Sequence, residues 1–594
     1  MGESPPATMP PANPPEDRLD SWKEIATHLD RDVTTVQRWE KREGMPVHRH
    51  LHDRSGSVYA YKSELNAWRQ SRKPRFDEEK AEAVEPSASV DADLGPSGAW
   101  LPRRWLVLGG VGTIVLLTLA YAFIRNRRDP TRPKIKSLAV LPLKNLSGDP
   151  AQEYLADGMT EAVIGRLSNI HDLRVISRTS VMRFKDTQLS VPDIAKQLNV
   201  DAIVEGSVMR EGSRIRVHAQ LIRAATDGHF WSEAYDRELR DALALESDVA
   251  QSIARKVEVT VTGEEHARLT AARPVSPEVY ENYLKGRFAL DRSKSRAGID
   301  EGIADFEEAI KKDPTFAPAY VGLANAHSNL ASVFIGAPPA IERAKVASAA
   351  RKALELDPQL AEAHVLLANM QQEQWQWTES EAEYKRALEL NPSDAAAHNG
   401  LALWLLSHGR TDEALAWVLR GRELDPLAVS GTEVAWVLFQ SRRFGEATHE
   451  LRSVLAVRPD DAAALWFLGF VLIANDRANE AIPVLEKTLS VSDRSSAVIG
   501  VLIRAYAHAG RRADALRLLV ELKSRKQAGY VPAAAFVNAY LGLSEKDEAL
   551  AWLEQAYKEQ SNILQWIKVH PYFDPLRDDP RFKVLLHRVG LDQP

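Results

Sequence analysis

Apolar residues recur along the chain in patterns that divide it into regions. Residues 1–16 hold six prolines and no apolar periodicity, which predicts a disordered tail. From residue 17 the spacing is helical, near residue 137 short apolar strands alternate with helices, and from residue 278 onward amphipathic helices follow one another in pairs. The pattern therefore predicts a multidomain, mainly α protein.

Residues 17–75 predict two short helices, a two-stranded ribbon and a third helix. Ser21 and Glu24 have the spacing of a capping box at the start of the first helix. In the second helix, Val33 to Lys41, Val36 and Trp39 share the inward face. Two helices joined by a tight turn within twenty residues have helix-turn-helix spacing. Candidate DNA-binding residues on the outward side of this helix, just after it and on the ribbon are Thr34, Thr35, Gln37, Arg38, Lys41, Arg42, Arg49 and Arg54.

Gln and Arg can form bidentate hydrogen bonds with the edges of adenine and guanine, whereas Thr and Lys can contact phosphates. The segments SWKEIATHL and TTVQRWEKREGMPVHR resemble the winged helix-turn-helix of the MerR and excisionase type. This resemblance implies that the second helix enters the major groove of double-stranded DNA and that the ribbon is the wing. Such modules usually bind paired half-sites, so a homodimer is a further expected partner. The alternative is a helical module with a solvated, charged face.

Three histidines, His48, His50 and His52, would share one face of the ribbon and could bind a metal. Histidines on an exposed wing more often contact phosphate or water. We therefore predict no metal and no cofactor.

Residues 76–102 are rich in Asp, Glu, Ala, Pro and Ser and predict an acidic linker. Residues 105–124 follow without a charge, and twenty helical residues span about 30 Å, the thickness of a bilayer core. The expectation is one transmembrane helix in the bacterial inner membrane. DNA binding requires a cytoplasmic amino terminus and hence a periplasmic carboxyl-terminal region. The excess of Lys and Arg after the helix favours the opposite orientation.

Residues 135–262 predict a small α/β sheet domain with a hairpin turn at Glu211-Gly-Ser213. Its sequence, from SLAVLPLKNLSGDP to EGSVMREGSRIRVHAQLI, resembles a domain that is described as similar to the amino-terminal part of TolB. That resemblance implies an architecture and no reaction. Asp157, Glu161 and Glu205 could act as acid or base groups, but no nucleophile or phosphate loop accompanies them, so solvated or capping roles are favoured.

Residues 278–570 contain helix pairs with a regular period. Pro358, Pro392 and Pro426 are 34 residues apart, which is the tetratricopeptide signature and predicts an α-solenoid. Residues 571–594 predict a capping segment over the last repeat. In this family the first helix of each repeat lines a groove that binds a protein or peptide; the alternative for these positions is core between repeats. Candidate groove residues are Asn369, Gln372, Asn399, Leu403, Trp436, Trp466 and Phe470.

Amino-acid composition and the lack of catalytic motifs exclude several classes of site. The 594 residues include no cysteine, which excludes disulfides, cysteine-ligated metals and cysteine nucleophiles. The net charge of −6 excludes a uniformly basic coat, although residues 17–75 carry a net +4. No P-loop, kinase loop, HExxH or GxSxG pattern occurs, so no enzyme is predicted.

Together these patterns predict a membrane-anchored, one-component transcriptional regulator that resembles ToxR-type proteins in layout. Cytoplasmic DNA binding would be coupled to sensing or protein docking by the sheet domain and the repeats. The alternative is a tetratricopeptide membrane signalling scaffold without DNA binding, because similar sheet-plus-repeat halves accompany adenylate cyclase domains.

Overall fold

The computed structural model divides the chain into two units, residues 1–128 and 129–594. The described residues are 17–19, 21–29, 31, 33–43, 45–49, 58–70, 134–224, 226–271, 273–292, 295–331, 339–427 and 430–592. The expected tail (1–16), the linker (76–102) and residues 105–124 lie outside them.

The first unit holds helices packed on a small antiparallel sheet. Its helices are α1 (Trp22–Leu29), α2 (Val33–Glu43) and α3 (Lys62–Gln70), and its strands are β1 (Arg18–Leu19), β2 (His48–Arg49) and β3 (Val58–Tyr61), in the order β1-β3-β2. Ile25, Val36 and Leu65, one from each helix, are completely buried together. The core therefore joins the three helices that the structure describes in this unit, despite the unit's small size.

The second unit begins with a mixed sheet. Its strands are β4 (Ser137–Val140), β5 (Lys144–Asn145), β6 (Arg174–Val175), β7 (Ala202–Glu211), β8 (Arg214–Arg223) and β9 (Gly228–Glu238). The order is β6-β4-β7-β8-β9, with β5 also paired to β7; β4 is parallel to its neighbours and β7, β8 and β9 are antiparallel. Alternate residues of β8 are buried, so one face of the sheet is covered.

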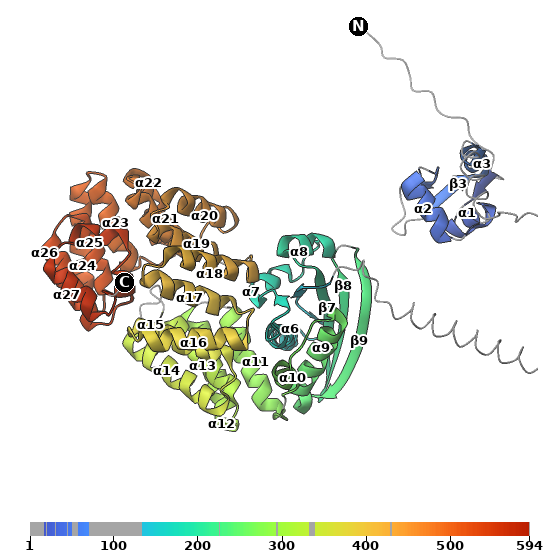
Figure 1. Ribbon diagram of the computed structural model, residues 1–594, viewed down its shortest axis with the longest axis horizontal. Helices are drawn as coiled ribbons and strands as arrows, with labels where there is room; N and C mark the ends of the chain where they lie inside the picture. The colour runs from blue at the N-terminus through green and yellow to red at the C-terminus, as the bar shows by residue number, and fades with distance from the viewer. Residues whose placement is uncertain are drawn as a thin grey trace, which may run out of the picture. The chain divides into compact units, whose positions relative to one another are not determined.

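Helices α6 (Glu153–Ser168) and α9 (Ala242–Val257) contact the sheet and each other (Figure 1). The remaining helices of this domain are η2 (Pro150–Gln152), α7 (Arg178–Val181), η3 (Met182–Phe184), α8 (Val191–Leu198), η4 (Leu239–Asp241) and α10 (Gly263–Thr270). A capping box of Thr262 and Glu265 begins α10.

Within the residues that the structure describes, eight helix pairs follow and form the repeat array. They are α11 (Pro277–Arg292), α12 (Arg296–Lys312), α13 (Ala317–Leu330), α14 (Pro339–Leu356), α15 (Ala361–Glu373), α16 (Trp377–Leu390), α17 (Ala395–Ser407), α18 (Thr411–Leu424), α19 (Ser430–Gln440), α20 (Phe444–Val457), α21 (Ala462–Ala474), α22 (Ala478–Val491), α23 (Ser496–His508), α24 (Arg512–Ala528), α25 (Ala533–Gly542) and α26 (Lys546–Lys558). The chain ends with η5 (Asn562–Trp566), η6 (Pro571–Leu576) and α27 (Pro580–Arg588).

Small residues let the two helices of a repeat approach closely. A Cβ atom on Gly469 would overlap the side chain of Leu485, and one on Gly400 would overlap Tyr384. Only glycine fits at these contacts without a shift of the neighbouring side chain.

The sheet domain is fixed to the array at two places. Near its start, Arg287 of α11 pairs with Glu161 of α6. In the middle of the array, the hydroxyl of Ser180 donates to Asp425 at 2.5 Å and accepts from the backbone N–H of Leu427 at 2.8 Å. Contacts so far apart along the chain hold the two parts of this unit together.

The structure corrects the predicted fold class and location. It is mainly α with a tetratricopeptide-type solenoid and a small sheet, but among the described residues no helix is long and apolar enough to cross a membrane. The transmembrane helix and the inner-membrane location are therefore not supported. Both predictions relied on a charge-free run in residues 105–124, and such a run does not by itself establish a long helix.

Candidate functional site

The first candidate site is the outward side of α2. Val36 is completely buried, and Trp39 packs against Trp68 with ring centroids 5.7 Å apart. Thr35 and Gln37 are half-buried at the flanks of this inward face. The side chains of Thr34, Arg38, Lys41, Arg42 and Arg49, and the whole of Arg54, lie outside the described residues.

Of the three histidines on the ribbon, only His48 lies within the described residues, and its partners are Glu64 and Tyr59. The Nε2 atom of His48 lies 2.8 Å from a carboxylate oxygen of Glu64, and its ring stacks on Tyr59. His50 and His52 lie outside the described ranges. Among the described residues, no three His, Cys, Asp or Glu side chains are placed to hold a metal ion.

The carboxylates of the sheet domain are engaged in structural contacts. Asp157 pairs with Lys185 at 2.7 Å, Glu161 pairs with Arg287, and Glu205 accepts a hydrogen bond from Gln220. Burial raises the pKa of Asp157, although Lys185 opposes that shift. Each carboxylate has a partner that explains its position.

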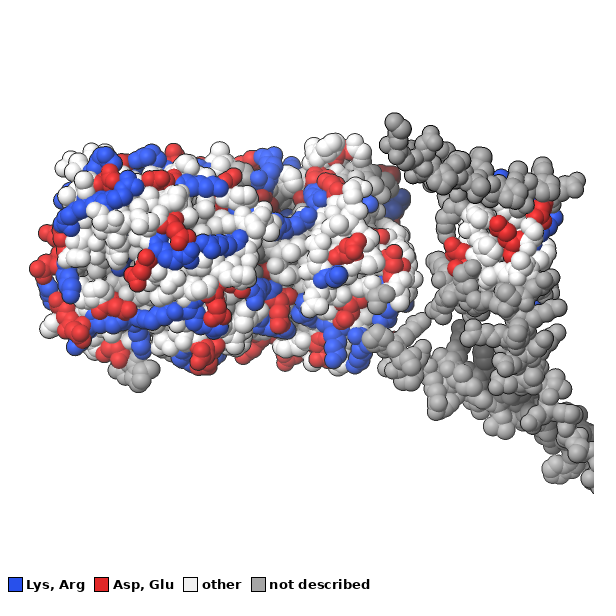
Figure 2. All heavy atoms as spheres, turned by 90° about the horizontal axis from the view of Figure 1, so that it is seen from above, with Lys and Arg blue, Asp and Glu red and all other residues white. Residues whose placement is uncertain are grey.

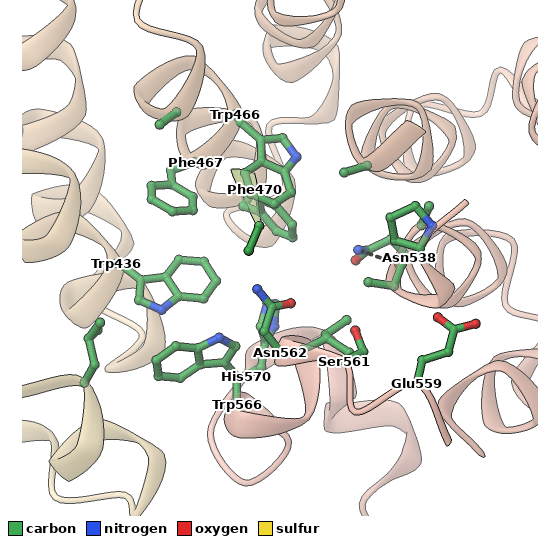
Figure 3. A pocket seen from close by; sticks show the side chains of 18 of the residues that line it. Trp436, Trp466, Phe467, Phe470, Asn538, Glu559, Ser561, Asn562, Trp566 and His570 are labelled. Atoms are coloured by element: carbon green, nitrogen blue, oxygen red, sulfur yellow. Dashed lines mark hydrogen bonds between the residues drawn. The ribbon is translucent and has the colours of Figure 1, made fainter. Parts of the chain in front are cut away.

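The second candidate site is a cavity of about 400 Å³ inside the second half of the array (Figure 3). Four of the seven predicted groove residues line it: Leu403, Trp436, Trp466 and Phe470. They come from α17, α19 and α21, so neighbouring repeats contribute to one wall.

The other three predicted groove residues lie elsewhere. Asn369 and Gln372 both accept from the hydroxyl of Tyr384, at 2.6 and 3.1 Å, and Gln372 also donates to Gln565 at 3.0 Å. Asn399 faces Gly421 of α18, the partner helix of its own repeat. These positions serve contacts within the fold.

The carboxyl-terminal segment, residues 559–592, runs along the inner side of the array. The hydroxyl of Tyr572 donates to the carbonyl of Phe470 at 2.8 Å, and the indole of Trp377 donates to the carbonyl of Val589 at 2.8 Å. Arg588 of the same segment pairs with Glu554 of α26 at 2.7 Å. The segment thus contacts the last repeat and also bridges to earlier ones, which closes the cavity on one side.

Several aromatic rings lie in the cavity wall. Trp436 stacks on Phe467 with centroids 4.9 Å apart and meets Trp566 edge-on at 5.7 Å. Trp466 meets Phe470 edge-on at 5.1 Å. Trp566 and His570 were missed by the sequence analysis, although the cluster of aromatic residues between 566 and 573 is a signal that could have found them.

Charged and polar groups lie among and opposite these rings. Glu433 lines the cavity one helical turn before Trp436, and Asn538 and Glu559 lie across the cavity from Trp436 (Figure 3). Burial raises the pKa of Glu433, and the nearby Asp425 raises it further. Arg343 also lines the cavity, but it pairs with Glu373 and donates to the carbonyl of Gln560 at 2.8 Å.

Comparison with known proteins assigns two of the regions. Residues 134–254 match the HilA/YgeH-like transcriptional regulator, second domain, and residues 368–429 and 434–497 match the tetratricopeptide repeat. The chain carries a HilA/YgeH-like regulator domain and tetratricopeptide repeats. These matches do not confirm the resemblances to TolB, to the MerR and excisionase proteins or to the ToxR layout.

Among curated proteins, the chain is similar to putative adenylate cyclase 3 of Rhizobium meliloti (strain 1021), with 36% identity over 194 residues. The match covers 33% of this chain, and the chain spans about a third of the length of that relative.

Among solved structures, it is similar to PilF of Pseudomonas aeruginosa (19% identity, 40% of this chain and 98% of that chain, TM-score 0.30). It is also similar to the human IFIT1 dimer with m7Gppp-AAAA (17% identity, 57% and 78%, TM-score 0.39).

Proposed function

We propose that the protein is a transcriptional regulator that binds double-stranded DNA through residues 17–75. The match to a transcriptional regulator domain in residues 134–254 supports the regulatory role. The net charge of +4 on residues 17–75, within a chain of net −6, supports DNA as the partner of this part. The module also resembles a MerR-type winged helix-turn-helix.

The observation that carries the proposal is the burial pattern of α2. Because Val36 is completely buried and Trp39 packs on Trp68, helical spacing puts positions 34, 38 and 41 on the opposite side of the helix. A helix of this kind, next to a short β-ribbon, has the arrangement with which winged helices enter the major groove. Arg38 would contact a base edge and Lys41 a phosphate.

The repeat array is proposed to bind a protein partner, as the tetratricopeptide match suggests. Since residues 559–592 line its inner side, a partner would contact the parts of the array that this segment leaves open. The array would then bring a second protein to the DNA-bound regulator.

Salt dependence of binding to non-specific duplex DNA tests the proposal. The full chain should bind at low salt, and Lys41→Ala should lower the slope of log K against log salt by about one unit, because one phosphate contact is lost. Lys583→Ala, an exposed lysine of α27, removes the same charge and should leave the slope unchanged. Absence of binding at low salt, or equal effects of the two variants, would contradict DNA binding.

Those results would favour the second candidate, a signalling scaffold without DNA binding. The specific observation behind it is the 194-residue match to a relative named as an adenylate cyclase.

A further inference from the structure

The cavity in the array has the size of a small-molecule site. Its volume of about 400 Å³ lies within the range of about 300–1,000 Å³ that is common for such sites. Residues 561, 562, 563, 566 and 570 of the carboxyl-terminal segment form one wall. A peptide threaded along the inner side would have to displace that segment, in which Tyr572, Phe573 and Leu576 are buried. A compact ligand needs no such displacement.

The walls present the faces and edges of aromatic rings. Trp436, Trp466 and Trp566 come from three separate elements, and Phe467 and Phe470 lie between the first two. The face of an indole ring carries negative charge density, so it attracts a cation more strongly than any other side chain ring does. Figure 3 shows these rings grouped on one side of the cavity.

The carboxylates of the cavity lack a positive partner. Among the residues that the structure describes, no Lys, Arg or His lies within ion-pair distance of Glu433 or Glu559, and Glu433 accepts from the hydroxyl of Thr432 at 3.0 Å. Glu559 accepts from the side chain of Gln555 at 2.8 Å and from the backbone of Ala533 at 3.3 Å. The one arginine in the lining, Arg343, is already paired with Glu373. The cavity therefore has an excess of negative charge.

We propose that this cavity binds a small organic cation with an apolar body, such as a quaternary or protonated amine. The apolar body packs on Phe467 and Phe470, and the charged group lies between the indole of Trp436 and the carboxylate of Glu433. Burial raises the pKa of Glu433, Asp425 and Asp461 raise it further, and the hydrogen bond that it accepts from the Thr432 hydroxyl at 3.0 Å opposes the shift; a bound cation would offset the repulsion from the two aspartates. This inference does not depend on DNA binding.

Calorimetric titration of the full chain with benzyltrimethylammonium tests it. The matched neutral probe is 2-methyl-1-phenylpropan-2-ol, in which a carbon bearing a hydroxyl replaces the charged nitrogen. We expect one saturable site for the cation. The alcohol should bind at least about ten-fold more weakly, because it lacks the desolvated cation–π contact and the charge contact. No heat for the cation up to millimolar concentration, or equal affinity for the two probes, would overturn the proposal.

Variants locate the site. Glu433→Gln should weaken the cation about ten-fold and leave the alcohol unchanged, whereas Trp436→Leu should weaken both probes. Glu446→Gln, an exposed glutamate of α20, is the control and should change neither affinity. Melting curves of the three variants show whether each is folded. If Glu433→Gln is folded and binds the cation as the unaltered chain does, the assignment of the site is wrong.

Discussion

The outer and inner sides of the array are built on the same repeat, yet their residues follow different rules. On the outer side an arginine pairs with an acid three residues later in four successive repeats. These pairs are Arg410–Glu413, Arg443–Glu446, Arg477–Glu480 and Arg511–Asp514. Seven residues before each arginine comes an inner position, and there the residue changes from repeat to repeat: Leu403, Trp436, Phe470 and Arg504.

The difference separates residues that maintain the fold from residues that make a site. Each outer arginine directly precedes the second helix of its repeat, and its hydrogen bonds lower the pKa of the paired acid. Figure 2 shows positive and negative side chains interspersed over the array. At the inner positions each residue has its own contacts: Trp436 lines the cavity, while Arg504 lies 3.5 Å from the ring centroid of Tyr572. A feature that recurs in successive repeats therefore says little about function.

The largest effect is expected from the buried carboxyl-terminal segment. Phe573→Ala should lower the free energy of unfolding by about 3–5 kcal/mol, because Phe573 is 1% exposed and its removal leaves a cavity. Val457→Ala, at an outer position that is 66% exposed, is the control and should change stability little. Chemical denaturation of both variants measures the difference. Equal small effects would mean that the segment is not packed on the inner side.

The pH dependence of stability should differ between a buried glutamate, Glu265, and an exposed glutamate of an outer pair, Glu446. Glu265, 2% exposed, accepts from the backbone and ring of His171 and from Thr262, and despite burial these bonds lower its pKa to about 2. Because the pKa of Glu265 is lower in the folded state than in the unfolded state, its ionised carboxylate stabilises the fold at pH values above the unfolded pKa near 4.5. That stability is lost as the pH falls toward 2.

Glu265→Gln should therefore cost up to about 3 kcal/mol at pH 7, and the cost should shrink as the pH approaches 2. Glu446→Gln, at an exposed outer pair, should change the melting temperature little at either pH. Melting curves across this pH range measure both. A pH-independent effect of Glu265→Gln would contradict the hydrogen bonds assigned to its carboxylate.

A smaller effect is expected inside the repeats. Gly469→Leu should cost about 1–3 kcal/mol, because any side chain there overlaps Leu485. Gly445→Leu is the matched control, since nothing lies within 4 Å of a Cβ atom at Gly445. An unchanged melting temperature for Gly469→Leu would show that the repeat register is wrong.

The sequence predicted the repeats well because their spacing is local. Prolines at intervals of 33 or 34 residues mark helix pairs whose contacts lie mostly within one repeat or its neighbour. Leu403, Trp436, Trp466 and Phe470, which the repeat spacing puts at corresponding inner positions, line one cavity.

The remaining wall of the cavity depends on contacts that no local pattern encodes. Tyr572 reaches Phe470 across 102 residues, and Trp566 meets Trp436 across a similar distance in the chain. The carboxyl-terminal segment has no repeat period, so its position could not be predicted from spacing. The transmembrane helix was predicted from residues 105–124, which lie outside the described residues, and no helix among the described residues is long and apolar enough to cross a membrane.

The central claim, that the chain is a DNA-binding regulator, is tested most directly by selection from a random pool of duplex DNA. The full chain should enrich one sequence motif, and Arg38→Ala should lose that enrichment, since a base contact is worth about 1–3 kcal/mol of discrimination. Lys41→Ala should retain the motif while binding all DNA more weakly. Enrichment of no motif by the full chain, or of the same motif with the same strength by Arg38→Ala, would contradict the assignment of α2 as the helix that reads DNA.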